Sequence, residues 1–143
     1  RIIKDMATIL PSNYKPTTKE KFMNAKQQEY FRQKLDKWRS ELLDEASETR
    51  QNLQETSVSE ADIADRASTE TDRSLELRTR DRARKLISKI DEALERIDAG
   101  SYGYCIETDE PIGLKRLEAR PIATLSLEAQ ERHEKMEKTQ RDD

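Results

Sequence analysis

The stretch Leu35–Leu53, LDKWRSELLDEASETRQNL, decides the fold of this chain. Its apolar and small residues recur at steps of three and four positions: Leu35, Trp38, Leu42, Ala46, Thr49 and Leu53. This spacing is typical of the a and d positions of a coiled coil, which pack one face of a helix against one partner. The residues between them are almost all polar, so the sequence predicts a long helix with a single narrow apolar face.

A second helical pattern further along the chain supplies the partner. Its members are Leu75, Arg82, Leu86, Ile90, Ala93, Leu94 and Ile97, weakly apolar at first and strongly apolar later. Two such helices, joined near Ser57 to Asp62, would form an antiparallel hairpin. We expect the hairpin to span residues 24–99, because Asn24 and Gln27 resemble a capping box and Gly100 is a good residue to follow a helix.

The remaining segments predict a loose arm, a small knob and a last helix. Residues 1–23 carry Pro11 and Pro16 and read as a loosely ordered N-terminal arm. In residues 100–126, SYGYC and LKRLEARP read as short extended pieces around the turn TDEPIG. Residues 127–143 hold a helix from Leu127 to about Lys138, capped by Ser126, and a polar tail. The predicted fold class is mainly α, a long antiparallel coiled-coil hairpin with a small knob.

Composition supports long helices and excludes a large globular core. Of 143 residues, 33% are hydrophobic and 40% are charged, with a mean hydropathy of -1.07. Three glycines and four prolines are few chain breakers, which favours helices over disorder. No apolar run approaches the roughly 20 residues of a membrane span. A single cysteine excludes an internal disulfide and fits a reducing compartment, so we expect a cytoplasmic protein.

Charge is divided along the chain more than its net value of -3 suggests. Residues 55–72 carry six acids and one base, Arg66, and are followed in residues 73–89 by seven bases and two acids. Such a division predicts a partner with a similarly divided surface, although a well-solvated helix pair would show it too. The net charge argues against a protein that coats DNA.

The sequence offers few residues that could act in catalysis. His133 is the only histidine, and in AQERHEKMEK it reads as a solvated helix residue. The three glycines are too scattered for a phosphate-binding loop. We therefore expect no enzyme acting alone.

The knob has the frame of a zinc ribbon without its ligands. The positions that would carry the four cysteines are Cys105, Thr108, Ser126 and Ala129. Only the first is a zinc ligand type, so we expect no zinc and a knob held by apolar packing. The expected core is Tyr102, Tyr104, Ile112, Leu114, Leu117, Ile122, Leu125 and Leu127. Cys105 would then be a buried cysteine that remains from the zinc-ribbon pattern without a role, or, as the alternative, a redox-sensitive thiol.

Three stretches in this order resemble the DksA/TraR family of bacterial transcription regulators. They are DIADRAS (62–68), SLELRTRDRARKLISKI (74–90) and YGYC with IGLKRLEARPIA (102–105 and 112–123). The resemblance implies a monomer that binds RNA polymerase without contacting DNA sequence. Its coiled coil would enter the secondary channel of the polymerase and bring the tip near the catalytic Mg²⁺. The cysteine positions place the chain with zinc-independent variants of the family.

The resemblance also implies roles for particular residues. The tip motif is matched by Asp62, Asp65 and Ala67, without the proline that can follow the first aspartate, so a more helical turn is expected. Arg82 would contact the channel rim, and Lys89 and Arg120 would bind the alarmone ppGpp (guanosine tetraphosphate) together with polymerase. The third alarmone position is Gln130, where the best-known form has lysine. Loss of that charge-assisted bond would weaken alarmone binding by about 1–3 kcal/mol.

Two other functions stay open from the sequence. A Gre-like transcript-cleavage factor also inserts a coiled coil into the secondary channel and lends carboxylates to position a second Mg²⁺. The spacing of Asp62 and Asp65, one helical turn apart, favours it less. A coiled-coil adaptor with no role at polymerase is the third reading.

Overall fold

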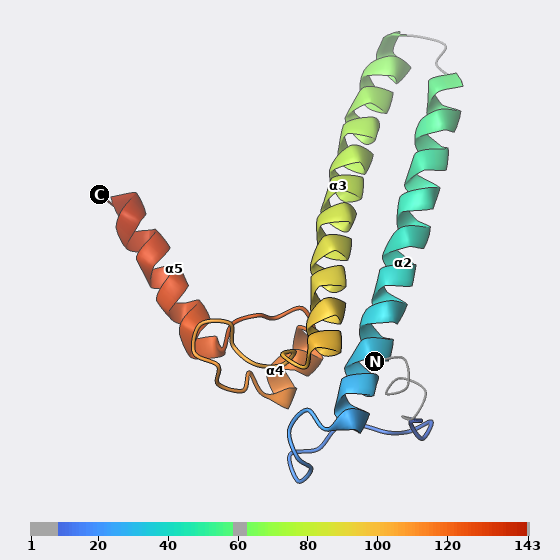
Figure 1. The fold of residues 1–143 in the computed structure, drawn as a ribbon. Helices are drawn as coiled ribbons and strands as arrows, with labels where there is room; N and C mark the ends of the chain where they lie inside the picture. The colour runs from blue at the N-terminus through green and yellow to red at the C-terminus, as the bar shows by residue number, and fades with distance from the viewer. Residues whose placement is uncertain (1–8, 59–62, 143) are drawn as a thin grey trace. The chain divides into compact units, whose positions relative to one another are not determined.

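The fold is described from a computed structural model that covers residues 9–58 and 63–142, with side chains described at 9–48, 51 and 69–140. The described residues contain α2 (Ala25–Val58), α3 (Ile63–Ala99), α4 (Leu114–Ala119) and α5 (Leu127–Asp142) (Figure 1). The chain divides into two compact units. We call residues 36–91 the shaft unit, and residues 1–35 with 92–143 the basal unit.

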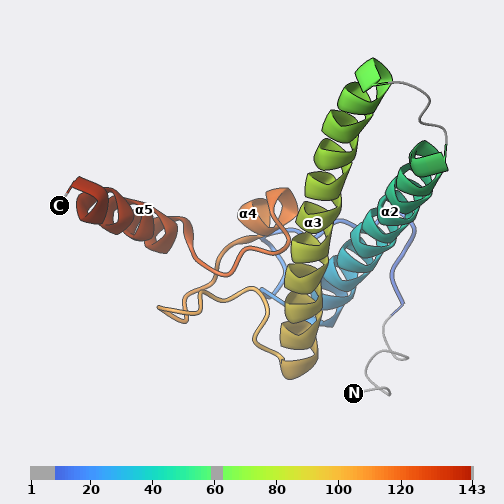
Figure 2. The same cartoon turned by 90° about the horizontal axis from the view of Figure 1, so that it is seen from above.

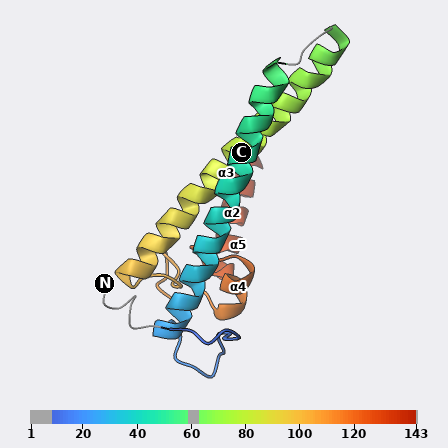
Figure 3. The same cartoon turned by 90° about the vertical axis from the view of Figure 1, so that its right-hand side faces the viewer.

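In the shaft unit, α2 and α3 run antiparallel and lie side by side (Figures 1 and 3). Leu42, Ala83 and Ile90 are buried between them. Arg39 Nε donates to Asp91 Oδ1 at 2.8 Å, and this half-exposed ion pair links the two helices. The predicted hairpin is confirmed, and its connection lies between Val58 and Ile63, where the sequence indicated it.

The side of α3 that faces α2 differs from the predicted one. Its buried or half-buried positions recur at steps of four and three: Thr69, Arg73, Glu76, Arg80, Ala83, Ile87 and Ile90. The predicted seam residue Leu75 is instead 53% exposed, and Arg82 is exposed. Ala83 and Ile90 set this heptad register. Carried toward the helix start, the register places Glu76 inside and Leu75 outside.

Most other predicted seam residues lie where the sequence placed them. Leu35, Leu42, Ile90, Ala93 and Ile97 are buried. Trp38, Ala46, Leu86 and Leu94 are half-buried. The side chains of Thr49 and Leu53 lie outside the described ones. Phe31, which the sequence pattern left out, is fully buried one turn before Leu35.

The core of the basal unit joins the start of α2, the end of α3 and the knob. Phe31 packs on Tyr102 with ring centroids 5.7 Å apart, and Ala93, Ile97 and Leu117 are buried. Of the expected knob core, Tyr102, Ile112, Leu117 and Ile122 are buried, and Tyr104, Leu114 and Leu125 are half-buried. Leu127 was predicted wrongly, because it is 58% exposed. Two residues later, Ala129 is fully buried, alone among the described side chains of α5.

The described part of the N-terminal arm is held by hydrogen bonds, contrary to the predicted loose segment. Gln27 is fully buried, and its Oε1 accepts the Met23 N–H at 2.7 Å. Its Nε2 donates to Thr17 O at 3.3 Å and to Glu20 Oε2 at 3.2 Å. The Tyr14 hydroxyl donates to the same Glu20 oxygen at 2.7 Å. Asn24 caps α2 as predicted, since its Oδ1 accepts the Gln27 N–H at 2.9 Å.

The knob is more helical than the sequence indicated. LKRLEA forms α4, so the predicted extended piece is wrong there; burial of Leu117 fixes this helical turn. The residues around SYGYC form one isolated antiparallel bridge in the described chain, Tyr104 with Pro111. Gly100, with φ of 83°, follows α3 as predicted. Figure 2 shows the loops that lead from α3 into α4 and then into α5, which continues past Lys138 to Asp142.

Candidate functional site

The predicted tip residues fall largely outside the described side chains. Asp62 precedes the first described residue of α3, and Asp65 and Ala67 belong to its first turns, with side chains that are not described. The helix begins at Ile63, and the turn residues 59–62, for which a more helical turn was expected, lie outside the described residues.

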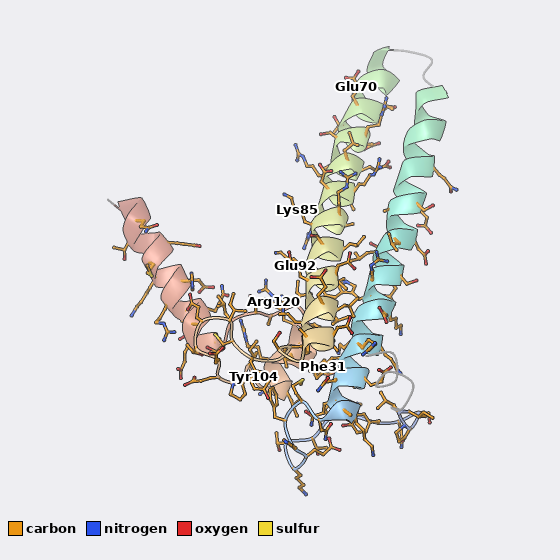
Figure 4. All side chains as sticks on the ribbon, viewed as in Figure 1. Phe31, Glu70, Lys85, Glu92, Tyr104 and Arg120 are labelled. Carbon is orange, nitrogen blue, oxygen red and sulfur yellow. The ribbon has the colours of Figure 1, made fainter. Side chains whose placement is uncertain are left out.

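Four cations form a row on the exposed side of α3. Arg78, Arg82, Lys85 and Lys89 recur at steps of four, three and four, and all are exposed. Lys85 points away from α2 in Figure 4. None of the four pairs with an acid among the described side chains, so each can meet an anionic partner. The sequence-based site prediction included only Arg82 and Lys89 of these four. The signal for the whole row was that Arg78 and Lys85 are also seven residues apart and lie one turn before Arg82 and Lys89 on the same face.

Arg120 and Gln130 belong to the basal unit, whereas Lys89 belongs to the shaft unit. Arg120 follows α4, its backbone N–H donates to Arg116 O at 2.8 Å, and its side chain is exposed. Gln130 is half-buried in the first turn of α5, where its Nε2 donates to Glu134 Oε1 at 3.3 Å.

The four zinc-ribbon positions form a hydrogen-bonded cluster. Cys105 is 1% exposed. Burial raises the pKa of its thiol, but hydrogen bonds from the Thr108 hydroxyl and from the backbone N–H groups of Ser126, Thr108 and Glu107 outweigh burial and lower this pKa to about 6. Ser126 Oγ accepts the Ala129 N–H at 3.2 Å and so caps α5. The protein therefore stabilises a thiolate here through hydrogen bonds.

This donor set does not fit zinc. A structural site needs four ligands, and these positions offer one thiolate, two hydroxyls and a methyl group. Within the part of the chain that the structure describes, no three His, Cys, Asp or Glu side chains converge as a metal site.

His133 is exposed, as expected, but it has a partner that the sequence did not reveal. Its Nε2 contacts Glu107 Oε1, and Arg132 Nη2 lies 3.9 Å from Glu107 Oε2. Glu107 thus links the knob loop to α5. The two partners are 26 positions apart in sequence, so no local pattern could have indicated the contact.

The fold defines a class of protein: a long antiparallel helical hairpin in one chain with a small unit that has the frame of a zinc ribbon. No helix among the described residues combines the length and apolarity needed to cross a membrane. Two family models match the chain, the N-terminal domain of DnaK suppressor protein DksA at residues 27–97 and the prokaryotic dksA/traR C4-type zinc finger at residues 100–135. The chain belongs to the DksA/TraR family.

Relatives and a solved structure agree with this assignment. The RNA polymerase-binding transcription factor DksA of Caulobacter vibrioides (strain NA1000 / CB15N) is 63% identical over 139 residues, which cover 96% of this chain and 98% of that protein. The factor of the same name from Escherichia coli (strain K12) is 42% identical, over 86% of this chain and 80% of its own. The structure of transcription factor DksA2 from Pseudomonas aeruginosa matches with a TM-score of 0.76 and 47% identity, covering 82% of this chain and 90% of that one.

Proposed function

We propose that this chain is a transcription factor that acts by binding RNA polymerase, and that it is not an enzyme. The observation that carries this function is 63% identity, over nearly the full length of both chains, to a factor named for polymerase binding. The row of four unpaired cations on α3 supplies a surface for such a partner. Because bacterial transcription takes place in the cytoplasm, we place the protein there, and we expect a monomer.

The hairpin would act by entering the secondary channel of the polymerase. An α-helix rises about 1.5 Å per residue, so the 34 residues of α2 span about 50 Å, enough for a tip to reach a recessed active centre. Asp62, Asp65 and Ala67 would then modulate open-complex stability near the catalytic Mg²⁺. Carboxylates suit hydrogen bonding to a basic or amide-rich surface. Arg82 would meet the channel rim.

Replacing Asp65 with Asn tests this mechanism. We expect Asp65→Asn to abolish inhibition of a ribosomal RNA promoter in purified transcription while binding to core polymerase changes little. Asp72→Asn, about two turns further along α3, is the matched control and should inhibit normally. Equal loss of binding and inhibition in Asp65→Asn would mean that the tip only anchors the protein. Shortened RNA in a stalled elongation complex would indicate a cleavage factor instead.

Regulation would depend on the alarmone ppGpp, bound together with polymerase through Lys89 and Arg120. Arginine and lysine are the expected chemistry for pyrophosphate groups. Both side chains are exposed in their own units. Titrating the protein against the same promoter with and without ppGpp tests this role. Inhibition that deepens with ppGpp would support it despite Gln130, and inhibition indifferent to ppGpp would contradict it.

The fold would also hold without zinc. The C4-type family model describes four cysteines, but Cys105 is the single cysteine of this chain. Hydrogen bonds and burial of Leu117, Ile122 and Ala129 take over the stabilising role of the metal in the knob.

A further inference from the structure

Glu118 on α4 connects the knob to α2 through one carboxylate oxygen. Its Oε1 accepts the Tyr30 hydroxyl at 2.6 Å and the Lys34 ammonium at 2.7 Å. Tyr30 and Lys34 are one helical turn apart on the same face of α2. The Lys34 Nζ also lies 5.9 Å from the centre of the Tyr30 ring. All three side chains therefore form one cluster, within the basal unit.

The cluster is ionised and stable around neutral pH. Partial burial raises the pKa of Glu118, but hydrogen bonds from Lys34 and Tyr30 and the nearby positive charges outweigh it, so this pKa is lowered. Burial and the Glu118 carboxylate raise the pKa of Tyr30 to about 12. The hydroxyl thus remains a donor, and the carboxylate remains an acceptor.

Helix α4, which carries Glu118, needs tertiary contacts to stay folded. α4 has six residues, no side-chain cap at its start and one buried side chain, Leu117. A helix this short is unstable without tertiary contacts. Its position on α2 thus depends on burial of Leu117 and on the contacts of Glu118.

Arg120 follows Glu118 by two residues, and the chain after it is also fixed. The Tyr102 hydroxyl donates to Pro121 O at 2.7 Å, and the Ala123 N–H donates to Arg120 O at 3.0 Å. The Arg120 side chain itself is exposed and has no partner among the described residues (Figure 4). Its backbone is held while its guanidinium remains free.

We propose that Glu118 is a positioning residue for Arg120: by attaching α4 to Tyr30 and Lys34, it fixes the backbone from which the Arg120 guanidinium reaches a pyrophosphate group. This inference rests on the alarmone role given to Arg120 above. A cation whose backbone is already fixed loses less conformational freedom on binding than one on a mobile segment, so the cluster strengthens the response to ppGpp. Glu118 itself does not touch the ligand.

The test measures the ppGpp concentration that gives half of its maximal effect on a ribosomal RNA promoter. We expect Glu118→Ala to raise this concentration by about five- to tenfold, in the range of ordinary coupling between sites. Inhibition without ppGpp should stay unchanged. The exchanged pair Lys34→Glu with Glu118→Lys re-forms the ion pair between α2 and α4 and should restore the wild-type value. Glu131→Ala, an exposed acid of α5, is the matched control.

The outcomes separate this inference from the alarmone role. If wild-type protein ignores ppGpp, the alarmone role of Arg120 fails, and the proposed positioning fails with it. If wild-type protein responds and Glu118→Ala responds equally, only the positioning role is overturned. If Glu118→Ala unfolds, Tyr30→Phe removes the 2.6 Å hydrogen bond while keeping the ion pair. A smaller rise in the half-effect concentration is then expected, and an unchanged value overturns the inference.

Discussion

The side-chain amide of Gln27 holds part of the N-terminal arm, a segment that the sequence predicts to be loosely ordered. Its side chain satisfies the backbone of Met23 and Thr17 and meets Glu20, which in turn holds Tyr14. A buried polar group is tolerated only when it is paired, so the arm and the start of α2 depend on each other.

Removing this amide should therefore weaken the fold. We expect Gln27→Leu to lower the free energy of unfolding by about 1–3 kcal/mol, because the Met23 N–H and its neighbours lose their partner. Urea denaturation followed by circular dichroism measures this change. Gln33→Leu is the control, since Gln33 is exposed and its side chain bonds only Glu29 on the same helix. Equal effects of the two substitutions would contradict the role of Gln27.

Cys105 makes a pH-dependent contribution to stability. Its folded pKa of about 6 lies below the ordinary thiol value of 9.0. A group with a depressed pKa stabilises the fold fully above its unfolded pKa, and this stabilisation is lost as pH falls through the folded pKa. We expect Cys105→Ser to destabilise the protein most near pH 9 and progressively less toward pH 6. Urea denaturation in a reducing buffer at pH 5, 7 and 9 measures the difference; a constant difference would disprove a stabilised thiolate.

At the scale of the element, the part of α3 around Glu76 buries one carboxylate oxygen and exposes two leucines. Glu76 Oε2 is buried without a hydrogen-bond partner among the described residues. Its neighbours Leu75 and Leu77 are 53% and 46% exposed. This stretch of the seam is thus packed less favourably than the stretch around Ala83 and Ile90.

Glu76→Leu should relieve the unfavourable burial. We expect it to raise the free energy of unfolding by about 1–3 kcal/mol, because an unpaired buried oxygen is replaced by an apolar side chain at a seam position. Thermal unfolding measures the gain. Asp81→Leu adds the same side chain at an exposed position of α3 and should not stabilise the protein. A fall in melting temperature with Glu76→Leu would show that Glu76 is paired in solution.

At the scale of the whole molecule, the lack of three of the four zinc ligands predicts how the melting temperature responds to metal removal. We expect a chelator to leave the melting temperature unchanged, because only Cys105 of the four zinc-ribbon positions is a zinc ligand type. The variant Thr108→Cys, Ser126→Cys, Ala129→Cys, which completes four cysteines, should bind zinc and become sensitive to chelator. A chelator effect on the wild-type protein would show that it holds a metal elsewhere.

Periodic features of the elements were predictable because they depend on local residue spacing. The seam from Leu35 to Leu42, the end of α3 at Gly100 and the caps at Asn24 and Ser126 were all predicted correctly. Prediction failed where a segment was too short to show a pattern and where a strongly apolar residue lay beside the true seam. LKRLEARP contains too few residues to show a period, and in α3 the apolar Leu75 drew the predicted seam one residue away from Glu76.

By itself, the sequence determined the helical hairpin, its connection, the family and the lack of zinc ligands, since each follows from residue types at fixed spacing. Only the tertiary structure decided the rotational setting of α3, the order of the arm around Gln27 and the contact of Glu118 with Tyr30, which are 88 positions apart. The physical reason is that a helix needs only its own residues to set its period. A contact between distant side chains depends on how whole elements pack, which no single stretch of sequence contains.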